Sequence, residues 1–221
     1  VETGAALGVA FDGDADRALF VSHTGKIIDG DAFLYLAGTA LKNKGRLPGD
    51  VIVATVMSNL GLEKALAANH IALIRTPVGD KYVLEEMLKR QAALGGEQSG
   101  HVIFSDFATT GDGILTALRV FETLRDSGKT FDSLTDEIKT FPQQLVNIRV
   151  KEKRPLNTLT SVQREIAAAE EEFNGGGRVL VRFSGTEPLA RVMIEAPSEA
   201  SVMKWTTRIA EAIRAELGAI E

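Results

Sequence analysis

The feature that most constrains this chain is the run Ala10-Phe11-Asp12-Gly13-Asp14-Ala15-Asp16-Arg17, in which three carboxylates alternate with small residues. Apolar segments at 7–11 and 18–21 flank the run, and each is typical of a short strand. In extended backbone, alternate side chains point to the same side, so we expect Asp12, Asp14 and Asp16 to converge. Carboxylates that converge repel one another unless a cation lies among them. Because oxygen ligands favour hard divalent ions such as Mg²⁺, this aspartate loop (residues 12–17) predicts a metal site.

The aspartate loop has two other interpretations, an EF-hand calcium loop and a polar turn between strands. The EF-hand calcium loop also begins D-x-D-x-D, but it requires Gly at its sixth position and Glu at its twelfth. Those positions are Arg17 and His23 here, so the EF-hand is excluded. A polar turn with solvated aspartates remains an alternative, although such a turn does not require three carboxylates on one side.

Composition limits the class of protein. The chain has 221 residues, 44 % of them hydrophobic, which suffices for one large core or two to three small ones. Its net charge of −5 argues against nucleic acid or an anionic membrane as the main partner. The chain has no cysteine, which excludes disulfides and thiolate metal sites. No apolar run approaches the ~20 residues that span a bilayer. We therefore predict a soluble, cytoplasmic α/β protein.

Strand and helix patterns alternate with short links through the first part of the chain. Strands are expected at 27–28, 51–57, 71–75, 93–94 and 102–104, and helices at 32–44, 60–69, 80–90 and 113–124. This alternation predicts a doubly wound α/β layer with a mixed sheet. A further helix is expected at 134–139.

The pattern changes between residues 140 and 145, where we expect a domain boundary. Beyond it, strands are expected at 146–150, 178–183 and 191–195, and helices at 159–173 and 199–217. These elements predict a small α+β domain at the C-terminal end. Trp205 falls at helical spacing with Ile209 and is expected in the core of that domain.

A second loop with chemical potential is Gly95-Gly96-Glu97-Gln98-Ser99-Gly100-His101, here called the Glu97 loop. A carboxylate among glycines can accept hydrogen bonds from vicinal hydroxyls, so the loop suits a polyhydroxylated ligand. It does not match the G-x-S-x-G elbow of serine hydrolases, because Glu97 and His101 occupy the two glycine positions. A polar hairpin loop without a ligand is the alternative.

A third loop, Arg182-Phe183-Ser184-Gly185-Thr186-Glu187-Pro188, lies between two expected strands and is here called the Arg182 loop. Its hydroxyls and backbone N–H groups, together with Arg182 and Arg191, predict an anion pocket suited to a small phosphate ester. No Walker sequence is present, so nucleotide phosphates are not specifically indicated. An ordinary β-turn with two surface arginines is the alternative.

Two helix starts, at Asp80-Lys81 and at Asp112, are lesser candidates. Lys81 lies at the start of a helix and could reach a ligand, whereas Asp112 is expected to be only a helix cap. The mixed-charge cluster at 151–154 is interpreted as a solvated strand end.

Taken together, the three loops resemble those of the α-D-phosphohexomutase superfamily in order and separation. They match that family's metal loop, sugar-specificity loop and phosphate-binding loop respectively. The stretches at 55–61, 78–83 and 109–113 are most similar to its bacterial phosphoglucosamine mutase branch. The resemblance covers essentially the whole chain, and three ordered motifs are far more specific than any one of them.

The resemblance implies a four-domain enzyme that moves a phosphoryl group between O6 and O1 of a hexose phosphate through a phosphoserine. It implies that Asp12, Asp14 and Asp16 bind Mg²⁺, and that Arg17, His101 and Lys81 are the candidate catalytic residues. Arg17 would orient the phosphoryl group, and His101 would assist proton transfer. The residues implied in substrate binding are Glu97, Ser99, Arg182, Ser184, Gly185, Thr186 and Arg191.

The resemblance also implies how the chain is divided. Residues 1–28 correspond to the tail of the second domain, 29–141 to the third and 142–221 to the fourth. The phosphoserine would lie upstream of Val1, so this chain alone is expected to bind Mg²⁺ and sugar phosphate without turnover. Two departures from the family pattern, Phe183 and Ala15, leave the implied contacts plausible.

The implied partners are a hexose phosphate or hexosamine phosphate and the missing N-terminal domains. An exposed strand edge beside those domains predicts self-association, for example as a homodimer. The preferred sugar stays open, with phosphomannomutase/phosphoglucomutase as the alternative activity.

Overall fold

The computed structural model describes residues 2–218, which divide into two compact units between Thr140 and Phe141. Each unit has its own hydrophobic core. No helix in the described residues is both long enough and apolar enough to cross a bilayer.

The main sheet of the first unit is mixed. Its strands are β4 (Val51–Thr55), β5 (Ala72–Thr76), β6 (Leu94–Gly96) and β7 (Val102–Phe104). They are ordered β5-β4-β6-β7, with β4 parallel to β5 and β6, and β7 antiparallel to β6.

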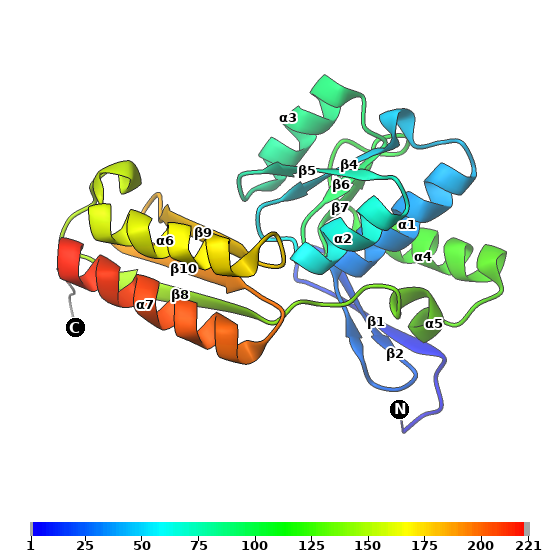
Figure 1. The fold of residues 1–221 in the computed structure, drawn as a ribbon. Helices are drawn as coiled ribbons and strands as arrows, with labels where there is room; N and C mark the ends of the chain where they lie inside the picture. The colour runs from blue at the N-terminus through cyan, green and yellow to red at the C-terminus, as the bar shows by residue number, and fades with distance from the viewer. Residues whose placement is uncertain (1, 219–221) are drawn as a thin grey trace. The chain divides into compact units, whose positions relative to one another are not determined.

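Helices cover both faces of this sheet (Figure 1). Ile52 and Ala54 of β4 belong to the core formed with α1 (Gly30–Asn43) and α2 (Leu60–Ala68), whereas Val53 packs with α3 (Asp80–Arg90) on the other face. The central strand is apolar from Val51 to Ala54 because both of its faces are buried. This arrangement confirms the predicted doubly wound layer.

A smaller antiparallel sheet precedes the main one. It contains β1 (Leu7–Phe11), β2 (Ala18–Ser22) and β3 (Ile27–Ile28) in sequential order. The Phe20 ring is fully buried and packs edge-on against Phe33 and Phe131. The opposite face of the sheet is apolar but exposed, at Leu19, Val21 and Ile27.

Two helices close the first unit, α4 (Gly113–Ser127) and α5 (Phe131–Thr135). Asp112 caps α4 as expected, because its carboxylate accepts the Leu115 N–H at 2.9 Å. The prediction of a helix at 134–139 was wrong in its bounds, because the helix lies several residues earlier, at Phe131–Thr135. Thr130 caps α5, accepting the Ser133 N–H, and this starts the helix at Phe131.

The second unit is the predicted small α+β domain. Its strands β8 (Gln143–Arg149), β9 (Arg178–Phe183) and β10 (Leu189–Glu195) form an antiparallel sheet ordered β8-β10-β9. Helices α6 (Thr160–Phe173) and α7 (Glu199–Leu217) pack against the sheet and each other. Trp205 lies in the core, where its indole N–H donates to Glu172 at 3.0 Å.

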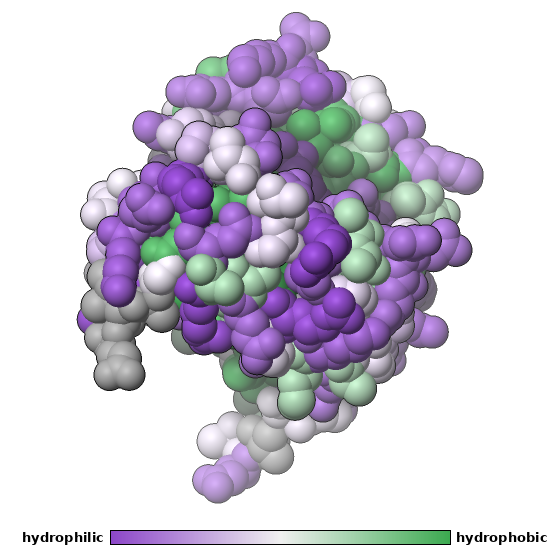
Figure 2. Space-filling model, turned by 60° about the vertical axis from the view of Figure 1, so that its left-hand side comes forward, coloured by the Kyte–Doolittle hydropathy of each residue, from purple (hydrophilic) through white to green (hydrophobic). Residues whose placement is uncertain are grey.

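The surface view agrees with a chain in which 25 % of residues are charged. On the face drawn in Figure 2, hydrophilic residues cover most of the surface and hydrophobic ones are visible between them.

One buried carboxylate joins the starts of α1 and α2. Asp29 caps α1, and Asp31 in its first turn is buried. The Asp31 carboxylate accepts the backbone N–H of Asn59 at 2.7 Å, and Asn59 in turn caps α2. Burial, together with repulsion from Asp29, raises the pKa of Asp31 to about 7.

This pKa predicts how stability depends on pH. An aspartate in the unfolded chain loses its proton near pH 4, whereas folded Asp31 keeps its proton up to about pH 7. The free energy of unfolding should therefore fall as pH rises from 4 to 7, by on the order of a few kcal/mol from this group. Asp31→Asn should remove this fall and raise stability at pH 8, measured by urea denaturation.

Glu85→Gln, at an exposed position on α3, is the matched control and should leave the pH profile unchanged. A pH profile of Asp31→Asn that runs parallel to that of the unmodified protein would contradict the prediction.

Candidate active site

The three carboxylates of the aspartate loop lie together. Oxygen atoms of Asp12, Asp14 and Asp16 are all within 4.8 Å of one another. The expectation that extended backbone would bring them together was wrong, because β1 ends at Phe11 and a tight turn follows. The Ala15 N–H donates to the Asp12 carbonyl at 3.2 Å, and the Arg17 N–H donates to the Asp12 carboxylate at 3.2 Å.

The electrostatics of this loop favour a cation. Partial burial raises the pKa of Asp16, and the charges of Asp14 and Asp12 raise it further. Arg17 offsets only part of this repulsion, since its Nε lies 3.6 Å from Asp12 and 3.8 Å from Asp16. Within residues 2–218, Asp16 Oδ1 is buried without a hydrogen-bond partner. Three hard oxygen donors with one oxygen unsatisfied fit a divalent ion such as Mg²⁺.

The Glu97 loop packs directly against the aspartate loop. The Ala18 N–H donates to the Gly100 carbonyl at 3.2 Å, and Arg17 and His101 form an isolated antiparallel bridge. Gly100 has a φ of +95°, and a Cβ there would lie 2.3 Å from the Ala18 carbonyl oxygen. Only glycine combines this backbone conformation with so close an approach.

His101 lies at the junction of three loops. Its side chain is buried, and Nε2 accepts the Gly111 N–H at 3.1 Å while lying 3.6 Å from Asp16 Oδ2. A Cβ at Gly111 would lie 2.3 Å from the imidazole ring, so the 109–113 stretch needs glycine at that position. Since Nε2 accepts from the backbone, a neutral His101 carries its proton on Nδ1.

A cavity of about 410 Å³ opens beside Glu97. Its lining includes Thr55 at the end of β4 and Met57 just beyond it, Val78 after β5 and Ser99 in the Glu97 loop. The carboxyl ends of parallel strands are the usual ligand crevice of open α/β sheets. The Glu97 carboxylate accepts the Gly79 N–H at 3.1 Å and the Ser99 hydroxyl at 3.3 Å, which aligns it at this crevice.

Lys81, a predicted site residue of the first unit, takes part in none of the contacts above. It is exposed in the first turn of α3, and its ammonium lies 4.6 Å from the centre of the Tyr82 ring.

The two arginines predicted for the anion pocket share one face of a hairpin in the second unit. Arg182 on β9 and Arg191 on β10 are direct cross-strand partners. Partial burial and the charge of Arg191 both lower the pKa of Arg182. Arg191 forms an ion pair with Glu187 at 3.4 Å. Like charges directly opposite are destabilising in a sheet, so this pair is suited to an anion.

The Arg182 loop turns at the end of this hairpin. Ser184 is buried, and its hydroxyl accepts the Glu187 N–H at 3.3 Å. Gly185 and Thr186 are exposed, and within residues 2–218 their N–H groups make no hydrogen bond to the protein. The loop therefore offers free donors beside two guanidinium groups.

One residue that holds the Arg182 loop in place was not predicted from the sequence. The Lys153 ammonium donates to the Ser184 carbonyl at 2.6 Å. The interpretation of 151–154 as a solvated strand end overlooked this contact, since nothing in a mixed-charge cluster identifies which lysine folds back on a loop thirty-odd residues away.

Removing the Lys153 contact should loosen the Arg182 loop. Lys153→Met leaves the Ser184 carbonyl without this donor. We expect the affinity for the small phosphate ester that the sequence predicts at this loop to fall about three- to tenfold, measured by calorimetric titration. Lys151→Met, two residues earlier, is the control and should bind as the unmodified protein does. Equal affinities for both variants would show that Lys153 does not support the loop.

Comparison with known proteins places these loops in one family. The description "Phosphoglucomutase/phosphomannomutase, alpha/beta/alpha domain III" matches residues 29–141, and that family's C-terminal domain matches residues 145–212. A phosphoglucosamine mutase of Solibacter usitatus is 59 % identical over 96 % of this chain and 48 % of its own length. One from Levilactobacillus brevis is 52 % identical over 99 % of this chain and 48 % of its own.

A solved structure shares the fold. The Aspergillus fumigatus N-acetylphosphoglucosamine mutase, in complex with GlcNAc-6P and magnesium, aligns with a TM-score of 0.75 at 23 % identity. The alignment covers 94 % of this chain and 48 % of that one. The chain thus spans about half the length of the curated relatives it matches.

Proposed function

Because the chain belongs to the phosphoglucomutase/phosphomannomutase family, we propose that it is the metal- and phosphate-binding part of a phosphoglucosamine mutase. The proposed reaction interconverts glucosamine 6-phosphate and glucosamine 1-phosphate, with a phosphoserine supplied by another part of the full-length protein. The observation that carries the proposal is the direct packing of the aspartate loop against the Glu97 loop, through the Ala18–Gly100 hydrogen bond. It joins a candidate metal site to a candidate sugar site.

In this proposal Asp12, Asp14 and Asp16 hold Mg²⁺, and the chemistry a bound ion supplies is neutralisation of charge on the transferring phosphoryl group. Arg17 adds a second positive group beside the loop and orients the phosphoryl oxygens. Glu97 and Ser99 hydrogen-bond the sugar hydroxyls from the wall of the 410 Å³ cavity.

We propose a positioning role for His101. Its buried ring accepts the Gly111 N–H and lies near Asp16, which supports a role in holding three loops together. The proton-transfer role implied for it stays a prediction, as does any ligand contact of Lys81.

The Arg182 loop is proposed to bind the substrate phosphate that does not react. Arg182 and Arg191 supply charge, and Ser184, Gly185 and Thr186 supply hydroxyl and N–H donors. Holding the non-reacting phosphate fixes the approach of the reacting oxygen, which lowers the entropic part of the barrier.

The family descriptions support our domain assignment, with residues 29–141 as the third domain, 142–221 as the fourth and 1–28 as the end of the second. The exposed apolar face at Leu19, Val21 and Ile27 would then pack against the rest of the second domain. We further propose a cytoplasmic enzyme, because its charged substrates do not cross a bilayer unaided. A homodimer stays a prediction.

Phosphomannomutase/phosphoglucomutase activity is the second candidate, since the matching family descriptions carry those names. Assays of the full-length protein with glucosamine 6-phosphate, mannose 6-phosphate and glucose 6-phosphate separate the two. We expect the highest kcat/KM with glucosamine 6-phosphate and loss of turnover when Mg²⁺ is chelated. A preference for mannose 6-phosphate, or full turnover in chelator, would overturn the corresponding part of the proposal.

The 221-residue chain alone should bind a sugar phosphate without converting it. Calorimetric titration with glucosamine 6-phosphate should show affinity that falls about tenfold or more in Arg182→Ala, because an arginine–phosphate contact is lost. Arg164→Ala removes an exposed arginine on α6 and is the control. Equal binding by both variants would count against the phosphate role of the Arg182 loop.

A further inference from the structure

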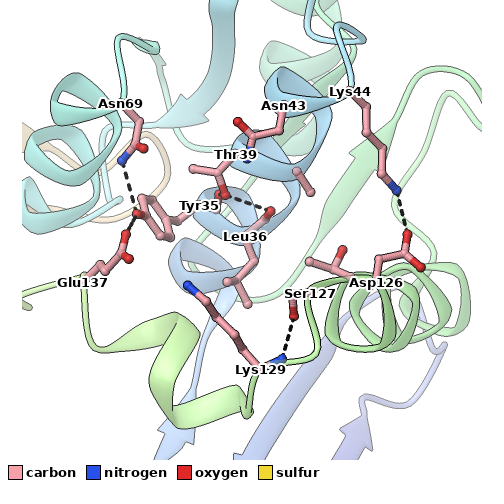
Figure 3. A pocket seen from close by; sticks show the side chains of 12 residues that line it. Tyr35, Leu36, Thr39, Asn43, Lys44, Asn69, Asp126, Ser127, Lys129 and Glu137 are labelled. Carbon is pink, nitrogen blue, oxygen red and sulfur yellow. Dashed lines mark hydrogen bonds and ion pairs between the residues drawn. The ribbon is translucent and has the colours of Figure 1, made fainter.

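A second cavity, separate from the Glu97 crevice, lies on the first unit. It measures about 340 Å³ and is lined by residues of α1, by the end of α4 and by the segments that follow α2 and α5 (Figure 3). No residue of the aspartate loop or the Glu97 loop lines it. Its size is within the range of small-molecule sites.

One wall of this cavity is a fixed polar network. Tyr35 is buried, and its hydroxyl donates to the Glu137 carboxylate and accepts from the Asn69 amide at 3.2 Å. The three side chains point toward one another in Figure 3. Burial and the Glu137 carboxylate raise the pKa of Tyr35 to about 12, so the phenol remains a donor and holds Glu137 in place.

Two opposite charges at the cavity are left without an ionic partner. Among residues 2–218, neither the Glu137 carboxylate nor the Lys129 ammonium forms an ion pair, and they do not pair with each other. In the view of Figure 3, Lys129 extends from the link after α4 toward Leu36 and Tyr35. The other two charged side chains here, Lys44 and Asp126, neutralise one another at 2.8 Å.

The C-terminal ends of three helices add a negative electrostatic potential at this cavity. Lys44, Asn69 and Ser127 line it, and they stand at the C-terminal ends of α1, α2 and α4 respectively. Helix C-termini carry partial negative charge and favour a cation. The Glu137 carboxylate and these helix ends therefore suit a cationic group, and Lys129 suits an anionic one.

The remaining lining suits a hydroxylated ring. Leu36 and Ala40 of α1 are the apolar part of the lining, with Leu36 almost fully buried and Ala40 half-buried. The apolar face of a pyranose can lie on this wall. Within the described residues, the Asn43 side-chain amide makes no hydrogen bond, so it has both a donor and an acceptor to offer hydroxyl groups.

We propose that this cavity is a second ligand site, which takes a small hydroxylated zwitterion of the size of a hexosamine phosphate. The amine lies against Glu137, the phosphate or other anion against Lys129, and the ring against Leu36 and Ala40. The inference uses side chains of the first unit alone, so it does not depend on the reaction proposed above.

The test is a titration of the isotope-labelled 221-residue chain, followed by amide NMR signals, in an Arg182→Ala background that weakens the other phosphate site. The probes are glucosamine 6-phosphate, which carries both charges, and glucose 6-phosphate and glucosamine, which carry one each. We expect saturable shifts at Asn43, Asn69 and Ser127 with glucosamine 6-phosphate. Glucose 6-phosphate and glucosamine should each bind with an affinity at least about tenfold lower.

Two variants make the test specific. Lys129→Gln should weaken glucosamine 6-phosphate binding at these signals about tenfold, and Lys129→Arg should retain it. Lys89→Gln, at an exposed lysine on α3 paired with Glu86, is the control and should have no effect. Lys129 is exposed, so its replacement should leave the spectrum elsewhere unchanged.

The proposal is overturned if shifts appear only around the Glu97 crevice. It is equally overturned if the three probes bind alike, or if Lys129→Gln behaves as Lys89→Gln does.

Discussion

The candidate site of this protein depends on the close backbone contact between the aspartate loop and the Glu97 loop. The Ala18 N–H reaches the Gly100 carbonyl at 3.2 Å, and the left-handed φ of Gly100 lets the two chains approach this closely. The His101 ring then fills the space beside Asp16 and binds the 109–113 stretch through Gly111. The candidate metal-binding and sugar-binding side chains therefore stand on two backbone segments that hydrogen-bond directly to each other.

Each unit brings like charges close together at its candidate site. Three carboxylates converge in the first unit, and two arginines stand opposite each other in the second. The shifted pKa values of Asp16 and Arg182, each moved toward the neutral form, show that burial and like charge oppose ionisation at both places. A ligand of opposite charge would relieve this repulsion, so the electrostatic energy that destabilises each site in the free protein would favour binding.

Much of the fold could be predicted because its signals are local. β9 and α7 run over the predicted residues 178–183 and 199–217, since their periodicity and caps lie within the elements themselves. The helix after α4 was misplaced because a single Thr130 hydroxyl decided its start. The aspartates were expected to converge through a strand, but hydrogen bonds to Asp12 fold them into a turn.

The sequence by itself determined which residue types each loop carries, because the three motifs are contiguous and their chemistry can be read from side chains and spacing. Tertiary structure alone decided the contacts between distant positions. It brought Lys153 to the Ser184 carbonyl, Asn59 to Asp31, and Glu137 to Tyr35. The pKa of Asp31 and the cavity beside Lys129 follow from such contacts, since burial and field depend on what packs around a group and not on its neighbours in the chain.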